Sequence, residues 1–167
     1  MNLTIHSDLT AERLRAIVRY CAVTGAFTWT IPPSNHLRLV GAAAGCDKRG
    51  YTIIKIDGRG YAAHRLAWLY VHGVWPKLHI DHRDGNTLNN ALSNLREATF
   101  AQNNANARRR SGKDIPKGVR KNRSGYTARI SHGGKQLTLG TFATVDLAAR
   151  AYLEAATRIY GEFARAA

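Results

Sequence analysis

An acid and an imidazole stand side by side where the stretch KLHIDHRDGNTLNN, residues 77–90, passes from an apolar run into a polar loop. Hydrolysis of a phosphodiester needs a base that deprotonates water and a cation that neutralises the phosphoryl oxygens. His82 suits the base because the ordinary pKa of histidine lies near neutrality. Oxygen ligands from Asp81 and, further along the chain, Asn103 suit Mg²⁺ or Mn²⁺ better than zinc. The pattern predicts metal-assisted cleavage of a nucleic acid.

These side chains need a particular frame to meet. Asp81 and His82 point to opposite sides of a regular strand, so only a strand end or a bulge lets both serve one site. The polar residues 83–86 break the strand at once. A second strand is expected over NLREAT, residues 94–99, and then a helix. Thr99 with Gln102 forms a capping box, which places Asn103 in or just after the first helical turn.

The segments before this frame predict a mixed set of elements. Residues 7–25 read as a short helix with Thr10 as its N-cap, and residues 26–31 as a strand. Residues 36–50 are rich in Gly and Ala and are expected to form a loop. Residues 51–56 predict a strand that ends in an Asp57-Gly58 turn. Residues 64–71 fit a helix that Gly73 ends.

The motif order HRLAW, IDHRDGN, NN, NLR and QNN over about residues 57–108 resembles the HNH endonuclease family, in particular its phage and intron-encoded homing endonucleases. The resemblance implies a ββα-metal finger that binds one divalent cation. It assigns Asp81 and Asn103 to the metal and His82 to the general base. Asn94 would hydrogen-bond across the loop and hold His82 in position. Many members have histidine where this chain has Asn103, which weakens the case for a tight zinc site.

Other interpretations of the same residues remain open. An isolated Asp-His pair is usually structural, and Asn94 can simply cap a turn. His64, in the HRLAW motif, is an auxiliary candidate that positions the finger or touches phosphate, or else a structural histidine. A zinc site built from His64, His72, His79 and a cysteine lacks recognisable spacing.

Composition limits the partners. The net charge is +14, from 25 Lys and Arg against 11 Asp and Glu, which favours a polyanion such as DNA or RNA over a merely solvated basic surface. No basic amphipathic helix or long apolar run points to a membrane. Cys21 and Cys46 cannot form a disulfide framework, and both are expected to be buried in a protein of a reducing cytoplasm, bacterial or phage-infected.

The last third of the chain changes character. Residues 108–116 are basic, with Gly, Ser and Pro, and read as a linker. GYTARIS, GGK and QLTLGTF predict strand, turn and strand, and residues 144–161 predict a helix. Strand alternation turns Tyr126, Ala128 and Ile130 toward the helix, with Leu137 and Leu139 from the next strand.

The motifs GVR, LGTF and AARAY…AA…YG over about residues 117–164 resemble the AP2/ERF DNA-binding domain. That family has a three-stranded antiparallel sheet, packed on one helix and laid in the major groove. Its sheet tryptophans are absent here, with Arg123 and Thr138 near their places, so its base preference is not carried over. The expected DNA-binding residues are Arg120, Lys121, Arg123, Thr127, Arg129, Ser131, Gln136 and Thr138.

Together these patterns predict an α+β protein: a ββα-metal HNH nuclease domain followed by a small AP2-like domain of three antiparallel strands and one helix. The expected boundaries are 1–107 for the nuclease domain, with an extension over 1–50 and a core over 51–107, then a linker over 108–116 and the DNA-binding domain over 117–167. The expected function is cleavage of double-stranded DNA with Mg²⁺ or Mn²⁺ by a homing endonuclease, acting as a monomer or a DNA-induced dimer. The alternatives are an AP2-type regulator with an inactive finger and a structural RNA-binding protein.

Overall fold

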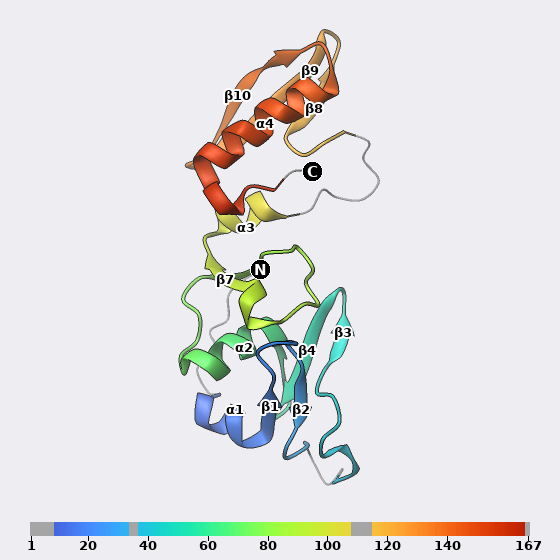
Figure 1. The fold of residues 1–167 in the computed structure, drawn as a ribbon, viewed down its shortest axis with the longest axis vertical. Helices are drawn as coiled ribbons and strands as arrows, with labels where there is room; N and C mark the ends of the chain where they lie inside the picture. The colour runs from blue at the N-terminus through green and yellow to red at the C-terminus, as the bar shows by residue number, and fades with distance from the viewer. Residues whose placement is uncertain (1–8, 34–36, 108–114, 166–167) are drawn as a thin grey trace. The chain divides into compact units, whose positions relative to one another are not determined.

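The computed structural model describes residues 9–33, 37–107 and 115–165. The chain forms two compact units, residues 1–97 and 98–167, which are described separately. Figure 1 shows the elements of each unit. Among the described residues no helix has the length and apolar character needed to cross a membrane.

The first unit is built from short strands around two helices. Its elements are α1 (Ala11–Ile17), β1 (Val18–Tyr20), β2 (Phe27–Trp29), η1 (Leu37–Leu39), β3 (Cys46–Lys48), β4 (Tyr51–Ile56), β5 (Arg59–Ala62), α2 (Ala63–His72), β6 (His79–His82), η2 (Leu92–Asn94) and β7 (Leu95–Ala98), whose last residue passes into the second unit. The sheets are β1-β2, β3-β4-β5 and β6-β7. Leu14, Ile54 and Leu66 lie in the middle of one apolar core, fully buried.

Three expectations for the first unit need correction. The helix stops at Ile17, because Val18–Tyr20 pair antiparallel with Phe27–Trp29, a pairing that suits β-branched and aromatic residues. The segment expected to be a loop contains β3, which pairs with the start of β4. Cys21 and Cys46 are exposed, since Cys21 directly follows β1 and Cys46 lies on a strand with no buried residue.

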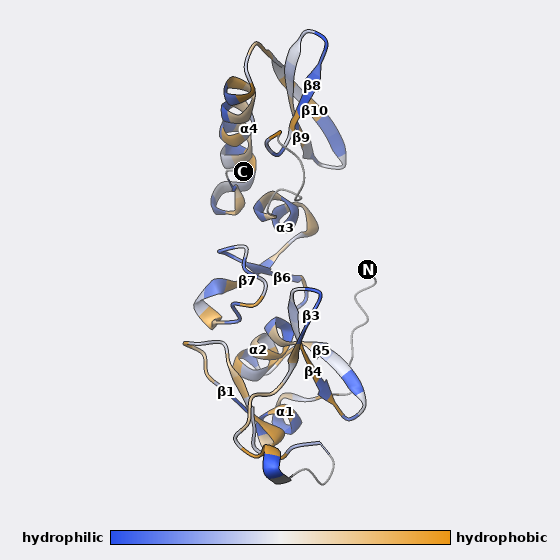
Figure 2. Cartoon of the chain, turned by 90° about the vertical axis from the view of Figure 1, so that its right-hand side faces the viewer, coloured by the Kyte–Doolittle hydropathy of each residue, from blue (hydrophilic) through white to orange (hydrophobic). Residues whose placement is uncertain are grey.

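The second unit packs one long helix on a three-stranded sheet. Its elements are α3 (Phe100–Asn106), β8 (Val119–Asn122), β9 (Gly125–His132), β10 (Lys135–Phe142), α4 (Val145–Tyr160) and η3 (Gly161–Phe163). The antiparallel strand order is β10-β9-β8. Ala128 and Ile130 of β9 share a core with Tyr152 and three alanines of α4. Figure 2 shows hydrophobic and hydrophilic residues alternating along α4, as expected for a helix with one buried side.

The boundary between the units differs from the expected one. Helix α3 belongs to the second unit, where Ala98 and Ala105 form a small cluster with Phe163. Lys117 strengthens this arrangement, because its Nζ donates to the carbonyls of Asn104, Ala105 and Ala107 at the end of α3. Apolar contact and helix capping thus attach α3 to the C-terminal part. Most of the predicted linker, residues 108–114, lies outside the described residues.

Candidate active site

Strand β6 presents Asp81 and His82 to different surroundings. Both side chains are buried, with 3% and 5% of their surface exposed. Asp81 lies inside the strand and His82 is its last residue, and a strand end permits two neighbouring side chains to serve one site.

Asp81 forms a buried ion pair. Its Oδ2 accepts a hydrogen bond of 2.8 Å from Nε of Arg96, on the paired strand β7. Both side chains are more than nine-tenths buried. A buried carboxylate needs such a partner, because desolvating a lone charge costs several kcal/mol. Sequence reasoning missed Arg96, whose only signal was its place on the predicted strand.

His82 lies among polar and aromatic groups from three other segments. Its Nε2 is 3.4 Å from Oδ1 of Asn90. The rings of His64 on α2 and Tyr51 on β4 have their centroids 5.1 Å and 6.5 Å from that of His82. Burial lowers the pKa of His82, although Asn90, Asp84 and Asp81 oppose that shift. The imidazole is therefore neutral at pH 7 and able to accept a proton.

His64 is itself a neutral imidazole beside His82. Burial, together with the neighbouring His82 and Arg65, lowers the pKa of His64 to about 3. His64 also lies against Tyr51, at 5.8 Å between ring centroids. The structure therefore brings the auxiliary candidate to the proposed base, and two neutral rings avoid the repulsion that two imidazolium ions would suffer.

The loop after β6 is held together by Asp84. Its carboxylate accepts hydrogen bonds from Asn86 N at 2.7 Å, Asn89 Nδ2 at 2.7 Å and Asn94 Nδ2 at 3.0 Å. Burial opposes ionisation, but these donors and His82 lower the pKa of Asp84 overall. The many asparagines in this stretch are therefore the hydrogen-bonding partners that shape the loop.

Asn94 bridges the loop, but not in the expected way. Its Oδ1 accepts from Asp84 N at 2.9 Å, and its carbonyl accepts from Arg83 N at 2.8 Å. Asn94 thus fixes the two residues after His82, whereas Asn90 reaches the ring of His82 itself. The sequence held no signal that separates Asn90 from its asparagine neighbours.

The N-terminal hairpin supports the loop at Asn90. The hydroxyl of Tyr20 donates to the Asn90 carbonyl at 2.8 Å, and Leu92 N donates to Ala22 O at 2.9 Å. Gly25, with φ of +75°, lies so close that a Cβ there would be 2.2 Å from the carbonyl carbon of Asn90. The extension before residue 51 therefore takes part in positioning the partner of His82.

The two predicted metal ligands belong to different units, Asp81 to the first and Asn103 to the second. Among the described residues, no group of three or more His, Cys, Asp and Glu side chains could hold a metal. His72 is exposed on α2 and both cysteines are exposed, so the zinc alternative gains no support. Asn103 lies on α3 in the second unit, partly buried. Carboxylate and amide oxygens are the kind of ligand that Mg²⁺ and Mn²⁺ take.

The second unit carries the expected DNA-binding residues on its sheet. The register aligns Arg120 with Thr127 and Arg129 with Thr138, which puts them on one face. Ser131 and Gln136 are paired on the same face, and Arg123 lies in the turn before β9. This face lies away from Ala128 and Ile130, which pack on α4.

Three of the sheet residues differ from expectation. Lys121 is aligned with Tyr126 and therefore shares the face on which Tyr126 packs toward α4. Thr127 is buried, and its hydroxyl bonds to Asn122 and Thr141 instead of being presented to a ligand. Leu137 is aligned with Ile130, as expected for an inward residue, yet stays 44% exposed.

Comparison with known proteins points in the same direction as the geometry. Residues 61–105 match the family model described as HNH endonuclease. The chain is similar to an uncharacterized HNH endonuclease of Acanthamoeba polyphaga mimivirus, with 35% identity over 119 residues. That alignment covers 70% of this chain and spans 62% of the length of the relative. No solved structure matches the chain.

Proposed function

We propose that the protein is an endonuclease that hydrolyses DNA phosphodiester bonds with a divalent cation. The observation that carries the proposal is His82: a buried, neutral imidazole next to Asp81, on a strand inside the segment that matches the HNH model. A neutral imidazole accepts the proton of an attacking water, a role that a protonated histidine cannot fill. The names of the family and of the viral relative support the same reaction class.

In this proposal each residue of the site has a separate task. His82 takes the proton of the water, and Asn90 and His64 fix the plane of its ring. Asn94 and Asp84 hold the loop that starts directly after His82. Asp81 and Asn103 are the residues that would hold Mg²⁺ or Mn²⁺. The cation, when bound, would neutralise charge on the phosphoryl oxygens and the leaving group.

The sheet of the second unit is proposed to target the nuclease. Arg120, Arg129, Gln136 and Thr138 present cationic, amide and hydroxyl groups from one face, which suits phosphates and base edges. Together with the AP2-like motifs and the net charge of +14, this face supports a homing endonuclease that reads duplex DNA. A DNA-binding regulator without cleavage remains the second candidate, because the ion pair with Arg96 engages one oxygen of Asp81.

A plasmid assay separates the two candidates. The full chain, freed of metal with EDTA, is incubated with supercoiled plasmid alone, with Mg²⁺ and with Mn²⁺. An endonuclease converts the plasmid to nicked or linear forms only when a divalent cation is added. Binding of the plasmid without conversion in any of the three conditions would favour the regulator and contradict the proposed activity.

A further inference from the structure

A cavity of about 560 Å³ lies within the second unit, beside the sheet. It forms because β8 pairs with β9 only as far as Val119 and Ala128, while β9 continues to His132. Residues of α3 and the segment Lys117–Gly118 line the other side. The volume falls in the range of small-molecule sites and exceeds what a simple inorganic anion needs.

The lining of this cavity is cationic. Lys117, Arg120 and Arg129 contribute to it, and none of the described residues that line it is Asp or Glu. Lys117 is already engaged with the carbonyls at the end of α3. The arginines are therefore the cationic groups that can serve an anion.

Arg129 gives the clearest indication that the cavity takes a ligand. Its Nε is buried and has no hydrogen-bond partner among the described residues. Its Nη1 donates to Gln136 Oε1 at 3.4 Å, a long contact along the same sheet face. A buried charged donor without an acceptor is costly, so an acceptor from a ligand would be favoured at this point.

Aromatic and backbone groups extend the cavity beyond an anion site. The rings of His132 and Tyr160 lie edge to face at 6.2 Å, and both line the cavity. Phe100 also lines it and is 67% exposed. The Gly133-Gly134 turn leaves its surroundings open, with no atom within 4 Å of a Cβ built at either residue. Such groups suit the planar base of a nucleotide.

We infer that this cavity binds the phosphate and base of one nucleotide, with the Arg129 guanidinium donating hydrogen bonds to the phosphate. The nucleotide is either a unit of a DNA strand or a free mononucleotide. The first source rests on the proposed function, in which the second unit engages DNA. The second source does not, because a mononucleotide site would exist even if the chain cut no DNA.

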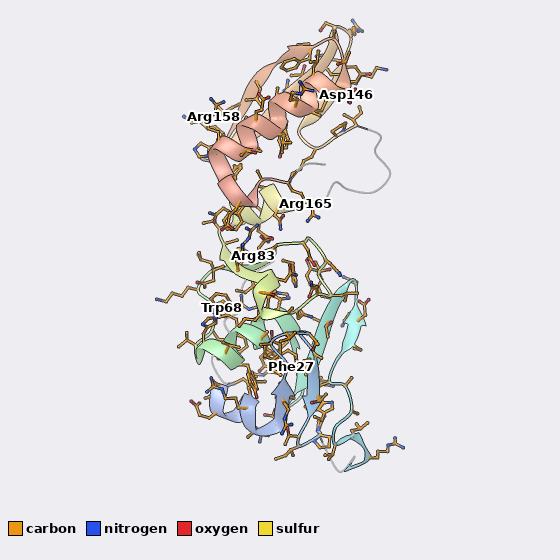
Figure 3. All side chains as sticks on the ribbon, in the orientation of Figure 1. Phe27, Trp68, Arg83, Asp146, Arg158 and Arg165 are labelled. Atoms are coloured by element: carbon orange, nitrogen blue, oxygen red, sulfur yellow. The ribbon has the colours of Figure 1, made fainter. Side chains whose placement is uncertain are left out.

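The test is titration of the full chain with a deoxynucleoside 5′-monophosphate, in EDTA and at fixed ionic strength, followed by ¹H–¹⁵N NMR. We expect shifts at Gly118 and at Ser131–Gly134. Arg129→Gln should weaken binding about tenfold or more, because a charge-assisted hydrogen bond is lost. Arg158→Gln is the matched control: it removes the same charge from an exposed site on α4, outside the cavity, and Figure 3 shows where it lies.

Arg129→Lys keeps the positive charge but lacks the Nε donor. If Arg129→Gln does not fold, Arg129→Lys replaces it in the test, and a dispersed NMR spectrum shows that Arg129→Lys is folded. It should bind the nucleotide more weakly than the wild type. Equal affinity in the wild type and both Arg129 variants, shifts located elsewhere, or no binding by the wild type would overturn the inference.

Duplex DNA measured over a salt series then separates the two sources. If a strand phosphate occupies the cavity, Arg129→Gln lowers the slope of log affinity against log salt by about 0.9 relative to Arg158→Gln. Loss of mononucleotide binding with equal slopes would support the cavity and assign it to a free nucleotide. Neither readout uses cleavage, so a failure of the nuclease proposal is recognised separately in the plasmid assay.

Discussion

Two adjacent buried residues of β6 differ in charge. Asp81 is a buried anion paired with the guanidinium of Arg96, whereas His82 is a buried neutral base beside a second neutral ring. Asp81 pairs with Arg96, whereas His82 contacts Asn90, so the two side chains have different partners. The aspartate and the histidine can therefore be tested one at a time.

Arg96→Met is expected to destabilise the protein by about 3–5 kcal/mol, because it leaves the Asp81 carboxylate buried without this cation. Arg13→Met is the control, since the Arg13–Asp57 pair is more than half exposed and should contribute at most about 1 kcal/mol. Urea denaturation of both variants gives the comparison. A similar decrease in the free energy of unfolding in both variants would show that the buried pair stabilises the protein no more than the exposed pair.

Stability should fall as the pH drops below the ordinary histidine pKa of about 6.5. The folded-state pKa of His64 is about 3, so between these values the unfolded chain binds a proton that the folded chain does not. The loss approaches about 1.4 kcal/mol per pH unit for each such histidine. We expect urea denaturation in EDTA to give a flatter fall between pH 6.5 and 5 for His64→Gln. The same pH dependence as in the wild type would contradict the assignment.

At the scale of elements, the β1-β2 hairpin acts as a support for the loop that follows β6. It contacts the Asn90 segment through Tyr20, through the backbone of Ala22 and through Gly25. Asn90 in turn contacts the ring of His82. Asn90 therefore links the N-terminal hairpin to the proposed base.

Gly25→Ala is expected to shift the Asn90 segment and to reduce both stability and cleavage, because the added Cβ would overlap the backbone of Asn90 and Ala91 at 2.2–2.3 Å. Gly41→Ala is a matched control: Gly41 has φ of +79° but nothing within 4 Å of an added Cβ. The control isolates the cost of the left-handed backbone, which is about 1–2 kcal/mol. Thermal melting and plasmid cleavage measure both effects. Equal losses would mean that close packing at Gly25 is unimportant.

Elements with strong local signals could be predicted from the sequence. The Thr99–Gln102 capping box, the Asp57-Gly58 turn and the end of α2 at Gly73 are all present. The β1 strand and β3 could not be predicted, because each forms by pairing with another strand. Local sequence does not encode such pairing.

The candidate site could be predicted only in part. The Asp81-His82 pair and the bridging of the loop by Asn94 followed from the motif. The Arg96 ion pair, the contact of Asn90 with His82 and the proximity of His64 arise from tertiary packing across 15, 8 and 18 residues of sequence, and no spacing rule specifies them.

At the scale of the whole molecule, the nuclease motif crosses the division between the two units. Its helix α3 packs with Phe163, and Lys117 caps its last turn. A chain cut before Lys117 would lose both supports, so separating the functions by truncation would also disturb α3. Point variants in the full chain are therefore a better test than truncation of which unit cleaves DNA and which unit targets it.

Arg120→Gln combined with Arg123→Gln should reduce the slope of log affinity against log salt by about 1–2 units on duplex DNA, since each phosphate contact contributes about 0.9. Both residues are exposed, so the fold should tolerate the change. Arg19→Gln with Arg59→Gln, two exposed arginines of the first unit, removes the same charge elsewhere. The proposed targeting role would be contradicted by equal slopes in the two double variants.

The most direct test of the account is the rate of DNA cleavage by His82→Ala with saturating Mg²⁺, compared with His72→Ala, which removes an exposed histidine of α2. Loss of a general base should slow cleavage about 10²–10⁴-fold while DNA affinity stays nearly unchanged. His72→Ala should cut at the wild-type rate. Cleavage by His82→Ala at the wild-type rate would show that this imidazole is not the base and that the candidate active site is wrongly assigned.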